Sequence, residues 1–87
     1  MFLHIGADAI VKLESVVGIF ELGTRSSAPA TREFLQLARA ERRLVEVAFG
    51  PPKSFVVTQE AVYLSPISAV TLKKRAGLLG AEDSGGA

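Results

Sequence analysis

Val and Ile are concentrated in a few short runs of this chain, and Gly, Ser and Pro separate those runs. Such a pattern, rich in β-branched residues and punctuated by turn formers, is typical of β-strands. It predicts six strands: FLHI ending at Gly6, AIVKL, SVVGIFEL, LVEVAF, SFVVT and AVYL. Gly18 interrupts the third run, where a glycine marks a β-bulge or a close backbone approach. The last two runs are joined only by Gln59 and Glu60, a hairpin-like link, so we expect neighbouring strands to be antiparallel.

A helix is predicted between the third and fourth strands. Ser26 or Ser27 is the expected cap, and Pro29 suits the first turn, where its missing N–H costs nothing. Apolar positions then advance by three and four, which gives an apolar stripe of Phe34, Leu37 and Ala38, with Leu35 at its margin. Another face carries Arg32, Arg39 and Arg43, partly balanced by Glu33 and Glu41.

A second helix is predicted near the C-terminal end of the folded region. Ser65 with Pro66 is a good helix opening, and Ser68 is the competing cap. This helix is expected to run through Leu72 to about Ala76 and to end before Gly77. Its last turns carry the basic residues Lys73, Lys74 and Arg75, and cations there favour the negative end of the helix dipole. The dipole alone explains this cluster without any ligand.

These elements predict a small α+β domain, antiparallel and β-rich, with about six strands, one central helix and one C-terminal helix. We expect one domain over residues 1–79 and a disordered Gly/Ser/Ala tail over residues 80–87. The 87-residue chain has no cysteine, yet 48% of its residues are apolar and its mean hydropathy is +0.32. So much apolar surface in so small a domain favours burial against other copies of the chain.

The distribution of charged residues along the chain is more informative than the net charge. The formal net charge is +1, but two of the nine acidic residues, Glu82 and Asp83, lie in the tail, and leaving them out gives +3. The basic residues form two groups: Arg39, Arg42 and Arg43, and then Lys73, Lys74 and Arg75. Clustered bases favour an anionic partner. The alternative is a solvated helix face, which is the more common reason for such a cluster.

Catalytic chemistry has little support in this sequence. The single histidine, His4, stands in an apolar strand, where a structural role is expected, and no Walker-type phosphate loop is present. We therefore expect no enzymatic activity, no cofactor and no metal site. No targeting signal or run of about 20 apolar residues is visible, so a cytoplasmic location is expected. Phe49 and Phe55 flank the segment GPPKS with Lys53 between them; both phenylalanines are interpreted as core residues, although nucleic-acid-binding strands also interleave aromatic and basic residues.

Three stretches, in this order and spacing, resemble a known family: MFLHIG at the start, TREFLQLARAE on the central helix, and KSFVVTQEAVYLSPISAVTLKKRA near the end. The chain resembles the small bacterial extracellular matrix regulatory proteins, the RemA/RemB family, from Met1 to Ala76. It is most similar to the RemB branch, where KS-VVT, YLSPIS and TLKKR are characteristic. The resemblance implies a β-rich fold that assembles into a closed ring of identical subunits. It also implies a transcriptional regulator that binds duplex DNA upstream of biofilm matrix genes.

The chain departs from the family in the loop after Gly50. In the RemA branch a pair of arginines that contact DNA follows the matching glycine, whereas this chain has Pro51 and Pro52 there and only Lys53 is basic. Proline offers neither charge nor donor, so the loop is interpreted as a stiff hairpin corner with Lys53 as its one contact residue. The expected DNA-binding residues are Lys53, Lys73, Lys74, Arg75, Arg39 and Arg43. Two alternatives remain: an oligomeric protein-interaction module without DNA binding, and an RNA-binding ring.

Overall fold

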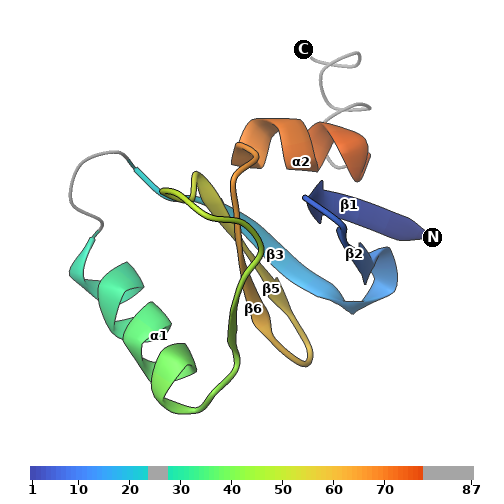
Figure 1. Cartoon of the computed structure of the whole chain (residues 1–87). Helices are drawn as coiled ribbons and strands as arrows, with labels where there is room; N and C mark the ends of the chain where they lie inside the picture. The colour runs from blue at the N-terminus through green and yellow to red at the C-terminus, as the bar shows by residue number, and fades with distance from the viewer. Residues whose placement is uncertain (24–27, 78–87) are drawn as a thin grey trace.

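The computed structural model describes residues 1–23 and 28–77. In chain order the elements are β1 (Phe2–Gly6), β2 (Ala9–Lys12), the 3-10 turn η1 (Leu13–Ser15), β3 (Val16–Glu21), α1 (Pro29–Ala40), β4 (Leu44–Glu46), β5 (Ser54–Thr58), β6 (Val62–Ser65) and α2 (Ala69–Arg75). The expected α+β class, with six strands, a central helix and a C-terminal helix, is confirmed (Figure 1). The predicted tail and the two predicted serine caps lie outside the described residues.

The strands form two sheets, and one connection differs from the prediction. β1 and β2 make a hairpin, while the second sheet has the order β3-β5-β6-β4. β4 and β5 are consecutive in the chain but are not neighbours, because β4 pairs in parallel with β6. The segment 47–53 is therefore a crossover connection and not a hairpin corner, and the expectation of antiparallel neighbours fails for this one pair. β4 also ends at Glu46, so the predicted strand LVEVAF is shortened by three residues.

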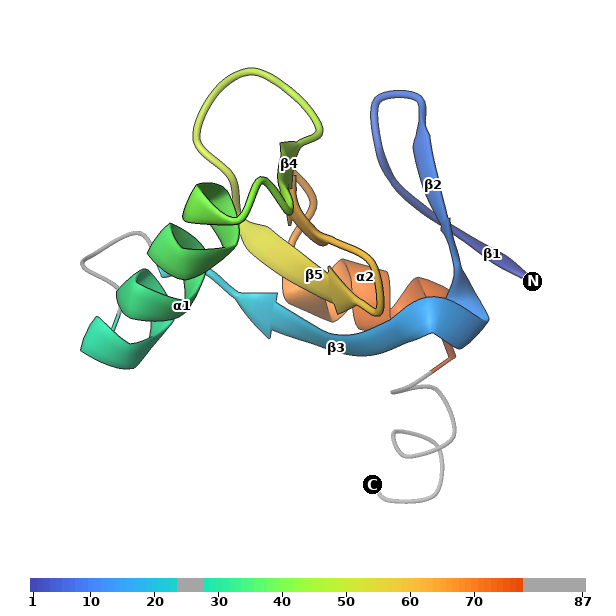
Figure 2. The same cartoon turned by 90° about the horizontal axis from the view of Figure 1, so that it is seen from below.

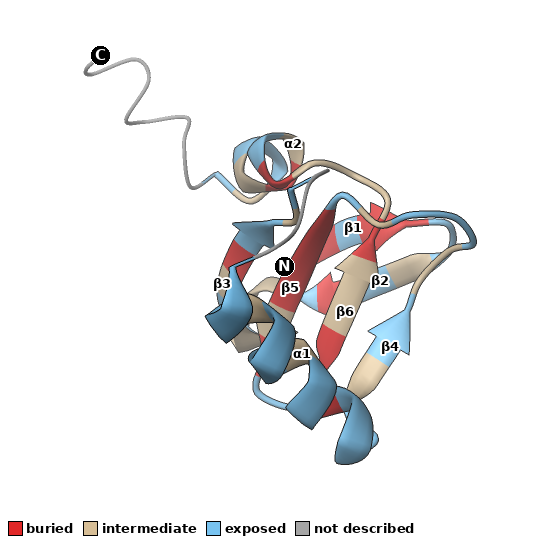
Figure 3. Cartoon of the chain, turned by 90° about the vertical axis from the view of Figure 1, so that its left-hand side faces the viewer, coloured by how far each residue is buried: buried red, intermediate tan, exposed pale blue. Residues whose placement is uncertain are grey.

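The four-stranded sheet has an apolar core on each face. On one face, Ile19 and Val56 pack with Leu72 of α2 and with Leu3 and Ile5 of the β1–β2 hairpin. On the other face, Phe55 and Val62 pack with Ala38 of α1. Figure 3 shows α1 crossing in front of the sheet, and Figure 1 shows α2 lying on the far side from α1. The two helices therefore cover opposite faces of one sheet.

Two buried serines join the sheet to the elements on the α2 face. Ser54 on β5 and Ser65 on β6 are register partners, and both are fully buried. The Ser65 hydroxyl donates to the carbonyl oxygen of Ile5 on β1 at 2.7 Å, and the Ser54 hydroxyl donates to that of Ile67 at 2.6 Å. Buried hydroxyls cost free energy unless they are hydrogen-bonded, so these bonds explain why polar residues are tolerated here.

Both ends of the segment between β6 and α2 are fixed by local contacts. Ser68 is the N-cap of α2, as the competing prediction had it, and its side chain accepts a hydrogen bond from the Thr71 N–H. A second N–H at the start of α2, that of Ala69, donates a 3.0 Å hydrogen bond to a carboxylate oxygen of Glu21 at the end of β3. Before the cap, Pro66 lies against Gly6, where a Cβ would come within 2.8 Å of the proline ring. The β1 strand can approach so closely because Gly6 has no side chain.

The first turn of α1 contains Pro29, as predicted, but the predicted apolar stripe is only partly buried. Ala28 occupies the N-cap position, where its side chain forms no capping hydrogen bond. Pro29 follows it in the first turn. Of the predicted stripe, Ala38 is buried, but Leu37 is 58% exposed and Phe34 is 40% exposed. α1 therefore covers its face of the sheet incompletely.

Phe49 corrects another expectation. Phe55 is a core residue, as predicted, at 6% exposure, whereas Phe49 is fully exposed at 104% of its reference surface. The reason is that the chain leaves β4 after Glu46 and crosses to β5, so Phe49 falls on the projecting loop 47–53 at the top of Figure 2.

Candidate nucleic-acid interface

The basic cluster of Lys73, Lys74 and Arg75 forms the last turn of α2. Lys74 and Arg75 are exposed and Lys73 is half-buried. The Arg75 guanidinium donates a long hydrogen bond of 3.4 Å to the His4 carbonyl oxygen, which keeps it beside β1. Among the described residues, no carboxylate lies within ion-pairing distance of these three side chains. The cluster therefore presents positive charge to solvent that no carboxylate of residues 1–23 and 28–77 compensates.

Lys53 lies near the other end of α2. Its backbone N–H donates to the Ser65 carbonyl oxygen at 2.8 Å, and its own carbonyl oxygen accepts from Leu22 at 2.8 Å. These bonds hold it where β3 and β6 end and β5 begins, next to the segment that leads into α2. The basic cluster is in the last turn of α2, so Lys53 and the cluster lie toward opposite ends of this helix. Its side chain is exposed.

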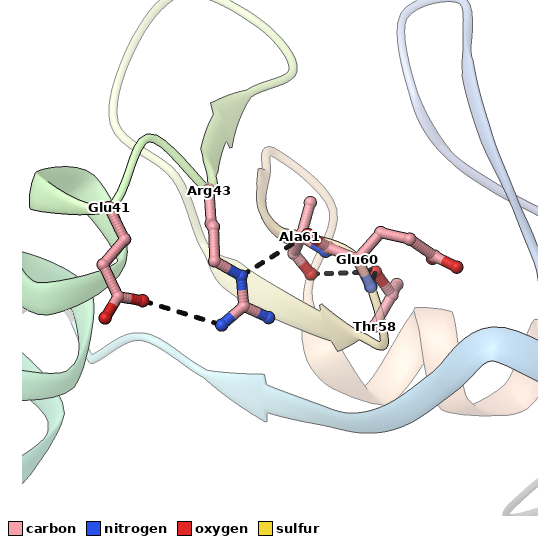
Figure 4. Close-up of polar contacts among 5 residues, drawn as sticks. All are labelled: Glu41, Arg43, Thr58, Glu60 and Ala61. Atoms are coloured by element: carbon pink, nitrogen blue, oxygen red, sulfur yellow. Dashed lines mark hydrogen bonds and ion pairs between the residues drawn. The ribbon is translucent and has the colours of Figure 1, made fainter.

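The predicted arginine face of α1 is engaged within the molecule. Arg39 forms an ion pair with Glu46 of β4 at 3.5 Å, and Arg43 forms one with Glu41 at 3.7 Å. Figure 4 shows that Arg43 also reaches the turn between β5 and β6, where its Nε donates to the Glu60 carbonyl oxygen at 3.4 Å. That turn is closed by Thr58, whose hydroxyl accepts from the backbone N–H groups of Glu60 and Ala61. Arg39 therefore links α1 to β4, and Arg43 links the segment just after α1 to the β5–β6 turn.

The structure separates the predicted contact residues into two groups. Arg39 and Arg43 lie with α1, on the face whose core contains Phe55, whereas the basic cluster lies on α2, on the face whose core contains Val56. A single flat contact with one subunit cannot engage both groups. The sequence could not reveal this separation, because it depends on which face of the sheet each helix covers.

The remaining ionisable groups of the described residues form no metal-binding cluster. His4 is exposed, and its ring nitrogen Nε2 pairs with the Ala7 carbonyl oxygen at 2.7 Å. The pKa of the Glu14 carboxyl lies below its usual value, first because of a backbone hydrogen bond within its own residue and then because of the N-terminal ammonium beside it. Within residues 1–23 and 28–77, no group of three or more His, Asp or Glu side chains could hold a metal ion. No helix in the described parts of the chain is long and apolar enough to cross a membrane.

Together these features define a class: a small α+β protein with no recognisable catalytic constellation in its described residues, a basic helix end and much uncovered apolar surface. Comparison with known proteins gives the family. The model of the RemA-like family, "Extracellular matrix regulatory protein A-like", matches residues 2–76. The chain is also 40% identical over 84 residues to "Extracellular matrix regulatory protein B" of Bacillus subtilis (strain 168), an alignment that covers 97% of this chain and 100% of the relative. The chain belongs to this family, and its expected place in the RemB branch is confirmed.

One set of surface residues was missed by sequence reasoning. Phe20, Phe34 and Phe49 are large aromatic residues in apolar runs or stripes, and each is substantially exposed. Their sequence pattern is the same as that of core residues, so only the fold distinguishes them. The one signal available beforehand was the overall excess of apolar residues, which indicated uncovered surface without locating it.

Proposed function

We propose that this chain regulates biofilm matrix genes by binding duplex DNA as an assembly of identical copies. Membership of the extracellular matrix regulatory family supports the regulatory role. The observation that carries the DNA-binding part is the last turn of α2, where Lys73, Lys74 and Arg75 lie together and are not paired with a carboxylate of the described residues. DNA phosphates are the anionic partner that such a cluster suits best.

The contacts are to the DNA backbone. Lys side chains act as compact positive charges, and Arg75 can grip a phosphate through two N–H groups. Backbone contacts position a protein on the duplex without reading base edges, so specificity comes mainly from DNA shape and deformability. One subunit supplies few contacts, and an assembly of subunits adds them through multivalency when the DNA spans several copies. On each subunit, Lys53 contacts the DNA backbone in addition to the basic cluster of α2.

The arginines of α1 play a smaller part in this proposal. Arg39 and Arg43 are already neutralised in part by Glu46 and Glu41, and Arg43 also supports the β5–β6 turn. A phosphate would have to compete with these carboxylates for the guanidinium groups. We therefore assign Arg39 and Arg43 mainly to holding α1 in place.

The test compares two sets of substitutions by fluorescence anisotropy with a labelled A·T-rich duplex at low salt. Lys73→Ala, Lys74→Ala and Arg75→Ala combined are expected to weaken binding roughly tenfold or more, because three phosphate contacts are lost. The matched control, Arg39→Ala with Arg43→Ala, removes two cations of the other face and is expected to weaken binding much less. Equal losses in the two variants would contradict the assignment to α2.

A second candidate is an oligomeric protein-interaction module that does not bind DNA. The observation that favours it is the number of uncovered apolar side chains, together with the ion pairing of the α1 arginines. An assembled protein that binds no duplex at low salt would support this candidate. If unlabelled RNA displaces the duplex more effectively than unlabelled DNA does, the partner is RNA.

A further inference from the structure

The loop of residues 47–53, between β4 and β5, carries a fully exposed aromatic side chain. Phe49 has 104% of its reference surface open to solvent. The next residue, Gly50, has a φ of +92°, and a Cβ built on it would meet no atom of the described residues within 4 Å. Figure 2 shows this loop projecting beyond the sheet. A single exposed apolar residue is common on protein surfaces, so its surroundings decide whether it has a role.

The base of this loop is fixed to the fold. The Val47 N–H donates to the Leu64 carbonyl oxygen at 3.1 Å, and the Val47 side chain packs against the core on the α2 face. At the other end, the Lys53 N–H donates to the Ser65 carbonyl oxygen at 2.8 Å. Two consecutive prolines restrict the backbone between these anchors. An aromatic ring on such a stiff loop loses little conformational freedom when it is inserted into a partner.

The charges around the ring suit a polyanion. Lys53 is exposed, four residues after Phe49, and residues 47–53 contain no Asp or Glu. Glu46, just before the loop, forms an ion pair with Arg39 at 3.5 Å. DNA offers both partners at once, since its bases have apolar faces that stack on aromatic rings and its phosphates attract cations. An apolar pocket on a protein would accept the ring but would leave the lysine without a partner.

We propose that Phe49 is a wedge that enters the minor groove of bound DNA, inserts between two base pairs and kinks the duplex, while Lys53 contacts a neighbouring phosphate. This inference rests on the DNA binding of the proposed function and names the feature of DNA that the loop recognises, a base step that unstacks easily. Phenylalanine is one of the side chains that proteins insert from the minor groove in this way.

The wedge gives the protein a preference that its phosphate contacts cannot give. Cations of the α2 cluster contact the backbone of any sequence, so they position the duplex without selecting a site. Pyrimidine–purine steps such as TA are unstacked and kinked most easily, and an inserted ring therefore favours sites that contain them. The kink also bends the duplex, which lets it contact more of the protein surface.

The test uses an A·T-rich duplex in which 2-aminopurine replaces adenine at the TA steps, because the fluorescence of this base rises when it is unstacked. Dyes at the two duplex ends report bending through energy transfer. Phe49→Ala removes the wedge, Phe49→Leu keeps an apolar one, and Lys53→Ala removes only the cation. The matched control is Phe2→Ala, which truncates another exposed phenylalanine on β1. Circular dichroism verifies the fold of each variant, and light scattering after size exclusion gives its mass without DNA.

We expect the wild type, Phe2→Ala and Phe49→Leu to raise the 2-aminopurine fluorescence and to bring the duplex ends closer at saturation. Phe49→Ala should give neither signal, and its affinity should fall roughly tenfold, the scale of one lost base–aromatic stack. Its slope of log K against log salt concentration should stay unchanged, because no phosphate contact is lost. Lys53→Ala should show the reverse, a shallower slope with the fluorescence change retained at saturation.

The outcomes separate this inference from the proposed function. A wild type that binds the duplex without raising the fluorescence would overturn the wedge and leave DNA binding standing. Folded Phe49→Ala with the affinity and fluorescence change of the wild type would overturn it too. A lower mass of folded Phe49→Ala would also overturn it, because the ring would then belong to a contact between copies. A wild type that binds no duplex at low salt would overturn the wedge and the proposed function together.

Discussion

The hydroxyl of Ser65 donates a 2.7 Å hydrogen bond to the carbonyl oxygen of Ile5, 60 residues earlier in the chain, inside the core. This bond ties β1 of the hairpin to β6 of the main sheet. The same hydroxyl accepts a hydrogen bond from the backbone N–H of Ile67, at the approach to α2. One side chain thus joins the hairpin, the sheet and the segment that positions the basic helix. The serines of the family motifs KS and YLSPIS have a structural role here.

Ser65→Ala is expected to lower the free energy of unfolding by about 1–3 kcal/mol, because the buried Ile5 carbonyl loses its partner. The measurement is urea unfolding monitored by circular dichroism. Ser15→Ala is the matched control, since the Ser15 hydroxyl bonds the Lys12 carbonyl oxygen at 2.8 Å in a solvent-exposed position. The control should change stability by less than about 0.5 kcal/mol. Equal losses of unfolding free energy in the two variants would show that the buried hydrogen bond contributes no more to stability than the exposed one.

Glu21 is predicted to stabilise α2 from the end of β3. Its carboxylate accepts a hydrogen bond from the Ala69 N–H, one of the unpaired donors at the start of the helix. Glu21→Ala removes both the acceptor and the charge and should cost about 1 kcal/mol of unfolding free energy. Glu21→Gln keeps an acceptor and should cost less. If thermal unfolding finds both variants as stable as the wild type, the contact is not a cap.

Gly18 is predicted to be required by the ring of Phe20. A Cβ at position 18 would come within 2.6 Å of that ring, which must then swing away from its stack on Phe55. Because Phe20 is half exposed and can move, Gly18→Ala should cost only about 1 kcal/mol. In a Phe20→Ala background the cost should largely disappear, and a double-mutant cycle measures that coupling. Additive effects would mean that the ring is not what excludes a side chain at position 18.

Replacing Pro51 and Pro52 by arginine is predicted to strengthen DNA binding. The substitution places two cations beside Lys53, and each new phosphate contact should steepen the salt dependence of log K by about one unit. The control, in which both prolines become alanine, accounts for the change in loop stiffness without added charge. Binding by the arginine variant no tighter than by the alanine control would indicate that this loop faces away from the DNA.

The strands and α2 could be predicted because their signals are local. β5 has the predicted bounds, Ser68 is one of the two predicted caps, and the basic last turn of α2 follows directly from the sequence. The parallel pairing of β4 with β6 has no local signal, since a short link between two apolar runs normally indicates a hairpin. The crossover loop 47–53, and with it the exposure of Phe49, follows from that non-local pairing.

The sequence predicted which residues contact DNA, but it did not predict how these residues are arranged on the surface. The sequence favoured Lys53 and the basic cluster of α2 over Arg39 and Arg43, but it could not indicate which of these cations share one face. Only the three-dimensional structure shows that Arg39 is paired with Glu46 and that the two helices lie on opposite faces of the sheet. Ion pairing across elements depends on tertiary packing, which no spacing rule within one helix contains.

The most direct test of the central claim, that this chain binds the DNA backbone, is the salt dependence of wild-type binding to a duplex. Anisotropy measured from low to moderate salt should give a linear fall of log K with log salt concentration, with a slope of about −0.9 per phosphate engaged. The account predicts a slope steeper than one subunit's few cations could produce, because several copies contact the same duplex. A folded, assembled protein that binds no duplex even at the lowest salt would contradict it.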